Sequence, residues 1–364
     1  MATMPEVLPP LYQRWIDALL PEGIPSETRS TCSSCAMLPK AGENADDRTF
    51  NPTTKCCTYL PDLHNFIAGN ILADDAPENY TARRTLERRI AARVAVTPLS
   101  IAPPPLYSVI YSNSALVGPA VFGHSASLKC PLYIEHTGQC GIWRHREAVC
   151  ATFFCKYERG TFGRRFWEAL SSFLGQLEYI LRVWALDQID PTTSLSNASL
   201  GAELNKPKKS IDAEGLANVI HPAKYERLWG PFVGREVEIY RSCADLVNRL
   251  DFSRVLEIAG GLMATAARSV REMHRRLIAD GLPGRVAIGD GHQVQIGRAP
   301  GKARLKNSLA LYDHIDVPVE ALAAATRLVG RPLAQAREQL RAEGLDVDDR
   351  TVRSLIDYEV LVPA

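Results

Sequence analysis

The stretch CPLYIEHTGQCGIWRHREAVCATFFC, residues 130–155, decides how this 364-residue chain is organised and contains four of its nine cysteines. In its first half, CPLYI and CGIW flank EHTGQ, which predicts a small β-hairpin with Cys130 on one arm and Cys140 on the other. Its second half contains Cys150 and Cys155 in a C-x4-C spacing. Cysteines grouped in this way in a chain without an export signal are typical of a metal or iron–sulfur site.

Four more cysteines precede this stretch, as a C-x2-C pair and as an adjacent pair. A C-x2-C pair on a turn lets two sulfurs approach one ion at about 2.3 Å, whereas adjacent cysteines are expected to serve two metals or one polynuclear cluster. Eight thiolates match two Cys₄ sites, and both zinc and iron–sulfur clusters prefer such ligands. The predicted metal ligands are Cys32, Cys35, Cys56, Cys57, Cys130, Cys140, Cys150 and Cys155.

The composition is that of an ordinary soluble globular protein, with 46% hydrophobic and 23% charged residues. A net charge of +1 argues against a general polyanion binder or a membrane-surface protein. No run approaches the roughly 18 apolar residues that span a bilayer. The first residues, MATMPEVLPPLYQRWIDALLPEG, lack the pattern of a signal peptide, so we expect a cytoplasmic, reducing environment. Disulfides would not persist there, which favours metal ligation over four disulfides.

The ninth cysteine is expected to have a different role. Cys243 falls on an apolar helical stripe with Val237, Tyr240 and Val247, and a lone cysteine in such a place is usually a small hydrophobic core residue. We therefore exclude it from the predicted ligands, which leaves an even number of eight.

The cysteine pattern resembles the YkgJ-type cysteine-cluster family, whose members are described as zinc- or iron-chelating domains. The family pattern opens with C-x2-C-x2-C-C and closes with a cysteine–proline pair, a hairpin strand, an arginine and an aromatic-rich C-x4-C. Matching positions of the closing half are occupied here by Cys130, Ile142, Arg146, Cys150 and Cys155. The opening half differs, because 20 residues separate Cys35 from Cys56 where the family usually has two. The resemblance covers residues 32–155 and implies metal binding.

Residues beside the cysteines have several possible roles. His64, His136 and His145 are alternative ligands that could replace a thiolate. Because eight cysteines leave little need for another ligand, we expect these histidines to lie at the surface or beside the ligands. Arg144 and Arg146 are candidates to neutralise part of the negative charge of a thiolate centre. Solvated turn residues are the alternative.

The rest of the chain has a helical pattern. Apolar residues recur at three- and four-residue steps from residue 162, and helices are also expected over 8–20, 80–94, 223–250 and 252–279. Between residues 96 and 134, prolines and the run YSVIYS favour short strands instead. The predicted fold is therefore α+β and mostly α. Its predicted parts are a cysteine-rich metal-binding domain with short strands (1–160), a helical domain with a linker near 187–210 (161–316), and a small helical, winged-helix-like module (317–364).

The C-terminal module invites a DNA-binding hypothesis, but its charge opposes it. Eight acidic residues against six arginines give this segment a net charge of −2, whereas DNA-binding modules present a basic face. A packing or protein-docking role is preferred.

Three functions stay open at this point. The first is a cytoplasmic metalloprotein that binds zinc or iron–sulfur clusters through eight cysteines, with a protein partner on the helical region. The second is an iron–sulfur redox enzyme, and the third is a metal-responsive regulator or adaptor that uses the C-terminal module. No catalytic residues can be assigned, because neither a nucleophile elbow nor an H-E-x-x-H helix is present in the sequence. The substrate, partner and metal identity are undetermined by the sequence.

Overall fold

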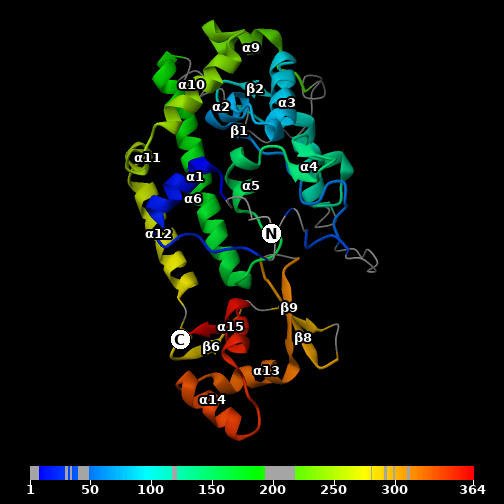
Figure 1. Ribbon diagram of the computed structural model, residues 1–364, viewed down its shortest axis with the longest axis vertical. Coiled ribbons are helices and arrows are strands. Elements are labelled where there is room, and N and C mark those ends of the chain that lie inside the picture. The colour runs from blue at the N-terminus through cyan, green and yellow to red at the C-terminus, as the bar shows by residue number, and fades with distance from the viewer. Residues whose placement is uncertain are drawn as a thin grey trace. The chain divides into compact units, whose positions relative to one another are not determined.

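The computed structural model describes most of the chain as helices joined by short antiparallel strands (Figure 1). The described residues are 8–28, 32, 35–39, 49–116, 121–192, 218–279, 281–290, 293–297, 300–309 and 312–364. The mostly helical α+β prediction is confirmed at this level. None of the helices in these ranges is long and apolar enough to cross a membrane.

The chain forms two compact units whose segments alternate along the sequence. The first unit comprises Met1–Gly23, Leu38–Phe153 and Ser171–Arg268, and the second comprises Ile24–Met37, Phe154–Leu170 and Ser269–Ala364. This division by contacts differs from the three consecutive domains expected from the sequence. Helices α6 (Gly160–Ile189) and α12 (Gly261–Ile278) contribute residues to both units.

Helices dominate the first unit. Besides parts of α6 and α12, its helices are α1 (Pro10–Leu19), α2 (Asn65–Ala73), α3 (Tyr80–Ala91), α4 (Pro105–Leu116), α5 (Ala148–Thr152), α9 (Pro222–Trp229), α10 (Glu236–Asn248) and α11 (Phe252–Ala259). Short 3₁₀ turns include η3 (Trp143–His145). Its strands are β1 (Leu63–His64), β2 (Val96–Thr97), β3 (Ser100–Ile101), β4 (Tyr133–Ile134) and β5 (Gln139–Cys140).

Helices α2 and α10 pack side by side in the core of the first unit (Figure 1). The sequence of α2 is apolar on nearly every face, which is typical of a helix enclosed on all sides. Gly69 permits the close approach, since a Cβ at this position would lie 1.9 Å from the Tyr240 carbonyl oxygen. Cys243 on α10 is fully buried, which confirms its predicted place in the core.

The predicted hairpin is also confirmed. Strands β4 and β5 pair antiparallel, with Tyr133 opposite Cys140 and Ile134 opposite Gln139. Gly138 takes a positive φ of 65° in the connecting turn, a conformation that costs glycine little. Strands β1, β2 and β3 form a second small sheet in the order β1-β3-β2.

Three predictions of secondary structure were wrong. The run YSVIYS lies in α4, not in a strand, because the helix begins at Pro105, the last of three consecutive prolines, and a missing N–H costs nothing at the first helical position. The helix expected over 223–250 is divided at Gly230, whose φ is 50°, and the one expected over 252–279 is divided at Gly260, whose φ is 79°. Of the linker predicted near 187–210, the first residues continue α6 to Ile189, and residues 193–210 lie outside the described ranges.

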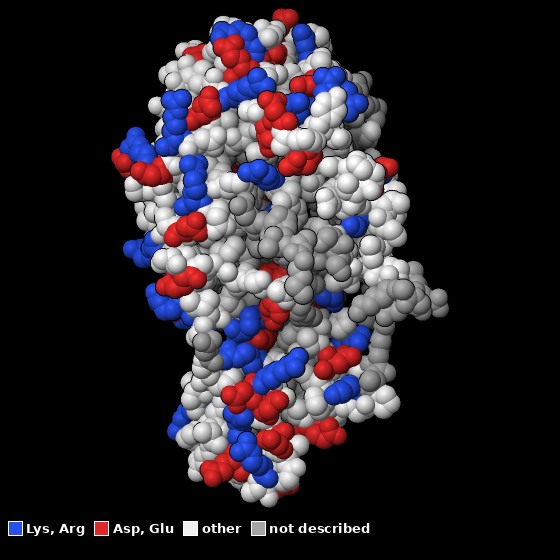
Figure 2. Space-filling model, in the orientation of Figure 1, with Lys and Arg blue, Asp and Glu red and all other residues white. Residues whose placement is uncertain are grey.

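The second unit has its own sheets and helices. Strands β7 (Gln293–Ile296), β8 (Lys302–Lys306) and β9 (His314–Pro318) form an antiparallel sheet, and β6 (Val286–Ile288) pairs with β10 (Leu361–Pro363). Helices α13 (Val319–Ala324), α14 (Leu333–Ala342) and α15 (Asp349–Asp357) cover a shared apolar core. Asp348 caps α15 by accepting a hydrogen bond from the Thr351 amide at 2.7 Å, as its position before the helix predicts. On the face in view, acidic and basic side chains are interspersed (Figure 2).

A buried carboxyl group gives the second unit a pH-dependent stability. Glu27 is 1% exposed and accepts hydrogen bonds from Trp167 Nε1 at 2.6 Å and from the Glu158 amide at 2.7 Å. Burial raises the pKa of Glu27 to about 7, against the opposing effect of these hydrogen bonds. The folded unit therefore binds this proton more tightly than the unfolded chain, so its contribution to stability is present below pH ~4.5 and is lost as the pH rises through about 7.

The variant Glu27→Gln tests this dependence, because an amide cannot ionise. Relative to the wild type, the variant should gain about 3 kcal/mol of unfolding free energy between pH ~4.5 and pH ~8. Denaturant unfolding followed by tryptophan fluorescence at both pH values measures this change, since Trp167 donates directly to Glu27. If the difference in unfolding free energy between Glu27→Gln and the wild type were the same at both pH values, the proposed effect of Glu27 on stability would be contradicted.

Candidate metal centre

Five of the eight predicted ligands belong to the first unit: Cys56, Cys57, Cys130, Cys140 and Cys150. Two hydrogen bonds to backbone carbonyl oxygens join the chain segments that contain these cysteines. The amide of Cys130 donates to the Cys57 carbonyl oxygen at 2.9 Å. The side chain of Lys55 donates from Nζ to the Gly138 carbonyl oxygen at 2.7 Å, at the turn of the hairpin. Residues separated by more than 70 positions are thereby brought to one place in the fold.

The hairpin positions Cys140 and the segment that follows it. Cys140 is the last residue of β5, and the Gly141 amide donates to the Leu132 carbonyl oxygen at 2.8 Å. A Cβ at Gly141 would lie 2.9 Å from that same oxygen, so the close approach of the two arms favours glycine. The chain then enters η3 and continues toward Cys150.

Cys150 lies in the first turn of α5, and its backbone is fixed from two directions. The Glu147 carboxylate caps this helix, accepting from the Val149 amide at 2.7 Å and the Cys150 amide at 2.8 Å. Arg146 donates to the Cys150 carbonyl oxygen at 3.1 Å and lies 3.6 Å from the centre of the Trp143 ring. The Glu147 side chain therefore fixes the start of α5 and the backbone of Cys150.

The thiols influence one another electrostatically. Burial raises the pKa of the Cys130 thiol to about 12, and the nearby Cys140 and Cys56 raise it further. Burial also raises the pKa of Cys150, with smaller contributions from Glu147, Cys140 and Cys130. For Cys56, the hydrogen bond with Cys57 is the main cause of a raised pKa, followed by burial. These thiols are therefore protonated at neutral pH without a bound cation, and binding a metal would release their protons.

Two basic residues other than Arg144 and Arg146 act on the thiols. Arg89 on α3 lowers the pKa of Cys130, and Lys55 lowers that of Cys56, although burial and hydrogen bonding outweigh both. Arg146 contacts a backbone carbonyl and an aromatic ring, and Arg144 is exposed. Sequence proximity favoured Arg144 and Arg146, whereas Arg89 approaches from a helix that is distant in sequence from every cysteine.

Two tyrosines of α4 and one on the loop that follows Cys57 interact electrostatically with Cys150. Tyr107 and Tyr111 stack with ring centres 6.0 Å apart, and Tyr59 packs against Tyr111. Tyr107 also donates to the Thr58 carbonyl oxygen at 2.9 Å. Burial raises the pKa of each of these tyrosines, and the Cys150 charge adds to each increase. An aromatic lining of this kind limits the access of water to a metal site.

The other three predicted ligands, Cys32, Cys35 and Cys155, belong to the second unit. All nine cysteines are free thiols. In the described ranges, no group of three or more His, Cys, Asp or Glu side chains is arranged closely enough to hold a metal ion. The donor chemistry of the five thiols in the first unit fits zinc or an iron–sulfur cluster, but their sulfurs would have to move closer together to coordinate one.

The three histidines near cysteines in sequence have other surroundings. His145 Nε2 lies 2.7 Å from Asp74 Oδ2, His136 is exposed, and His64 lies 3.3 Å from Arg182 through Nδ1. Burial lowers the pKa of His64 to about 4, so its ring is neutral at neutral pH.

A buried pair of carboxyl groups lies beside Cys150 and was not anticipated from the sequence. Glu178 accepts a hydrogen bond from the Tyr12 hydroxyl and another from the Ala148 amide at 2.8 Å. Burial raises the pKa of Glu178 and of Glu147; the Glu147 charge adds to the increase for Glu178, and the Asp62 charge adds to the increase for Glu147. The sequence did contain one signal of this buried pair, because Glu178 is a charged residue within the apolar stripe of α6.

Comparison with known proteins gives no match to this chain among family models, curated proteins or solved structures. The function of the site is therefore argued from its own residues.

Proposed function

We propose that the first unit contains a thiolate metal centre. Its ligands for zinc or for an iron–sulfur cluster would be Cys56, Cys57, Cys130, Cys140 and Cys150. The observation that carries this proposal is the hydrogen bonding that links the Cys56-Cys57 segment to the Cys130–Cys140 hairpin. The raised pKa values of Cys130 and Cys150, in which neighbouring cysteines take part, support the closeness of the thiols.

Several features agree with this function. The closing half of the pattern resembles the YkgJ-type family, for which metal chelation is the implied role. Lys55 and Arg89 would partly neutralise the negative charge that four thiolates give a divalent ion. Cys32, Cys35 and Cys155 remain proposed ligands of a second set within the other unit, which would account for all eight predicted cysteines.

The identity of the bound metal would distinguish a structural role from a redox role. Zinc held by four thiolates has no open coordination position, so it would make the protein a structural or interaction module. An iron–sulfur cluster would instead supply electron transfer, with its potential adjusted by the surrounding hydrogen bonds and by solvent access.

Anaerobic purification followed by metal and acid-labile sulfide analysis tests the proposal. A colourless protein with bound zinc supports the structural role, and a brown protein whose visible absorption is bleached by dithionite supports the redox role. Protein that binds neither metal, even after growth in zinc- or iron-supplemented medium or reconstitution in vitro, would overturn the proposal.

A further inference from the structure

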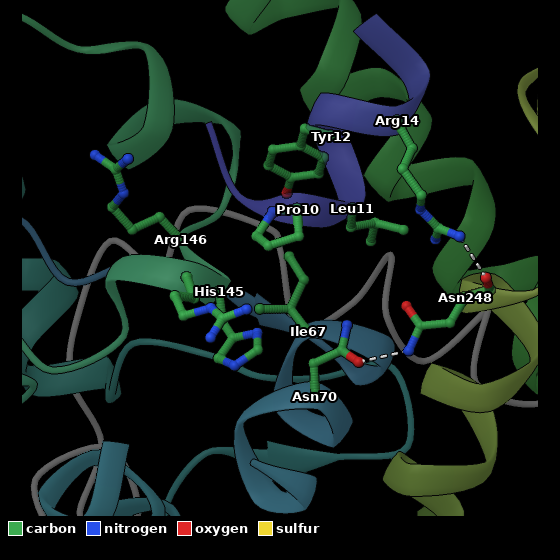
Figure 3. A pocket seen from close by; sticks show the side chains of 10 residues that line it. Pro10, Leu11, Tyr12, Arg14, Ile67, Asn70, His145, Arg146 and Asn248 are labelled. Atoms are coloured by element: carbon green, nitrogen blue, oxygen red, sulfur yellow. Dashed lines mark hydrogen bonds between the residues drawn. The ribbon is translucent and has the colours of Figure 1, made fainter. Parts of the chain in front are cut away.

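A cavity of about 390 Å³ lies in the first unit, on the side of η3 (Figure 3). Residues of α1, α2, η3 and the end of α10 line it. Its volume falls within the range of about 300–1,000 Å³ that is usual for small-molecule sites.

Positive charge predominates in the lining, which includes three arginines and neither aspartate nor glutamate. Arg146 is already engaged with the Trp143 and Cys150 carbonyl oxygens. Arg144 is exposed and makes no hydrogen bond or ion pair with any residue that the structure describes. Arg14 donates from one nitrogen to the Asn248 carbonyl oxygen at 3.0 Å, which leaves its other N–H groups available.

Two carboxyl groups outside the lining interact with lining residues: Glu178 accepts a hydrogen bond from the Tyr12 hydroxyl, and Asp74 interacts electrostatically with Arg144. Asp74 bonds to His145 Nε2 through Oδ2 at 2.7 Å and is absent from the lining. The lining itself contains no carboxylate, so Arg14 and Arg144 present their donors to the cavity.

Besides the arginines, Tyr12 and His145, the lining residues are apolar or carry a side-chain amide. Leu11, Ile67 and Pro10 form an apolar wall, and Leu11 is only half-buried. Asn70 accepts a hydrogen bond from Asn248 Nδ2 through Oδ1 at 2.7 Å, so its own amide nitrogen remains a donor (Figure 3). Cationic donors and an apolar wall together match a ligand with an anionic head and a hydrocarbon body.

We propose that this cavity binds a small carboxylate with an apolar body, whose carboxylate group is held by Arg14 and Arg144 and whose hydrocarbon part packs on Leu11 and Ile67. Inorganic phosphate would leave the apolar wall without a partner, which favours a carboxylate of this kind. The inference does not require the metal centre, since none of its binding groups is a proposed metal ligand.

Isothermal titration calorimetry with phenylacetate as the probe tests the proposal. Phenylacetate should bind in a saturable way, and phenylacetamide and inorganic phosphate should each bind at least about tenfold more weakly, because one lacks the charge and the other lacks the apolar body. Arg144→Gln should weaken phenylacetate binding about tenfold, and Leu11→Ala by a smaller factor.

Arg227→Gln is the matched control, since Arg227 is an exposed arginine on α9 in the same unit but away from the lining. Its phenylacetate affinity should equal that of the wild type. Absence of saturable phenylacetate binding, equal binding of phosphate, or unchanged binding by Arg144→Gln would overturn the proposal. The metal content of the same samples is a separate reading, so a failed metal assay leaves this result interpretable.

Discussion

Replacing Cys150 with serine is expected to remove the metal from the first unit. Glu147 and Arg146 hold the backbone of Cys150 by hydrogen bonds, which fixes the position from which the Cys150 side chain extends. A serine hydroxyl is a poor substitute for a soft thiolate ligand. Cys140→Ser should also remove the metal. Cys140 is a second proposed ligand, at the end of β5, and η3 separates it from Cys150 along the chain. Metal content per chain, measured after anaerobic purification, gives the result.

The control for these variants is Cys243→Ser. Cys243 is fully buried on α10, and burial alone raises its thiol pKa to about 12, so no neighbouring thiol acts on it. Its replacement should leave the metal content unchanged, although the protein loses some stability. Equal metal loss in Cys140→Ser, Cys150→Ser and Cys243→Ser would refute the ligand assignment.

Gly69→Ala is expected to destabilise the first unit by about 3 kcal/mol or prevent its folding. The added Cβ would lie 1.9 Å from the Tyr240 carbonyl oxygen and 2.8 Å from the Ala244 Cβ, so α2 and α10 would have to separate. Separation would also strain the hydrogen bond from Arg241 to the Leu72 carbonyl oxygen, which is 2.6 Å long. Denaturant unfolding followed by far-UV circular dichroism measures the loss.

Gly175→Ala is the matched control within the same unit. A Cβ at Gly175 would meet only the Ala148 Cβ, at the ordinary van der Waals distance of 3.9 Å. Because glycine weakens the middle of a helix, alanine should stabilise α6 by about 0.5–1 kcal/mol. If Gly69→Ala were as stable as Gly175→Ala, that result would contradict the close packing of α2 against α10 at Gly69.

Local signals accounted for much of the secondary structure. The apolar period that begins at residue 162 predicted α6, and the CPLYI and CGIW arms predicted the hairpin. The failures arose where one residue changes the backbone locally. Pro105 begins α4 within a run that favours strands by composition, and Gly230 and Gly260 divide helices whose apolar period continues past them.

The candidate site was less accessible to sequence reasoning. Residue types and spacing nominated Cys130, Cys140 and Cys150 together, but they carried no information on the hydrogen bond between the Cys130 amide and the Cys57 carbonyl oxygen. Such long-range contacts depend on how α3, α4 and the hairpin pack. Arg89 was missed for the same reason, because it acts on Cys130 from a different element.

X-ray absorption at the zinc or iron edge of the anaerobically purified wild-type protein tests the central claim most directly. A thiolate centre predicts a first coordination shell of sulfur, with zinc–sulfur distances of about 2.3 Å if the metal is zinc. A first shell made mainly of nitrogen or oxygen, at about 2.0–2.2 Å, would show that the cysteines of the first unit are not the ligands and would contradict the account.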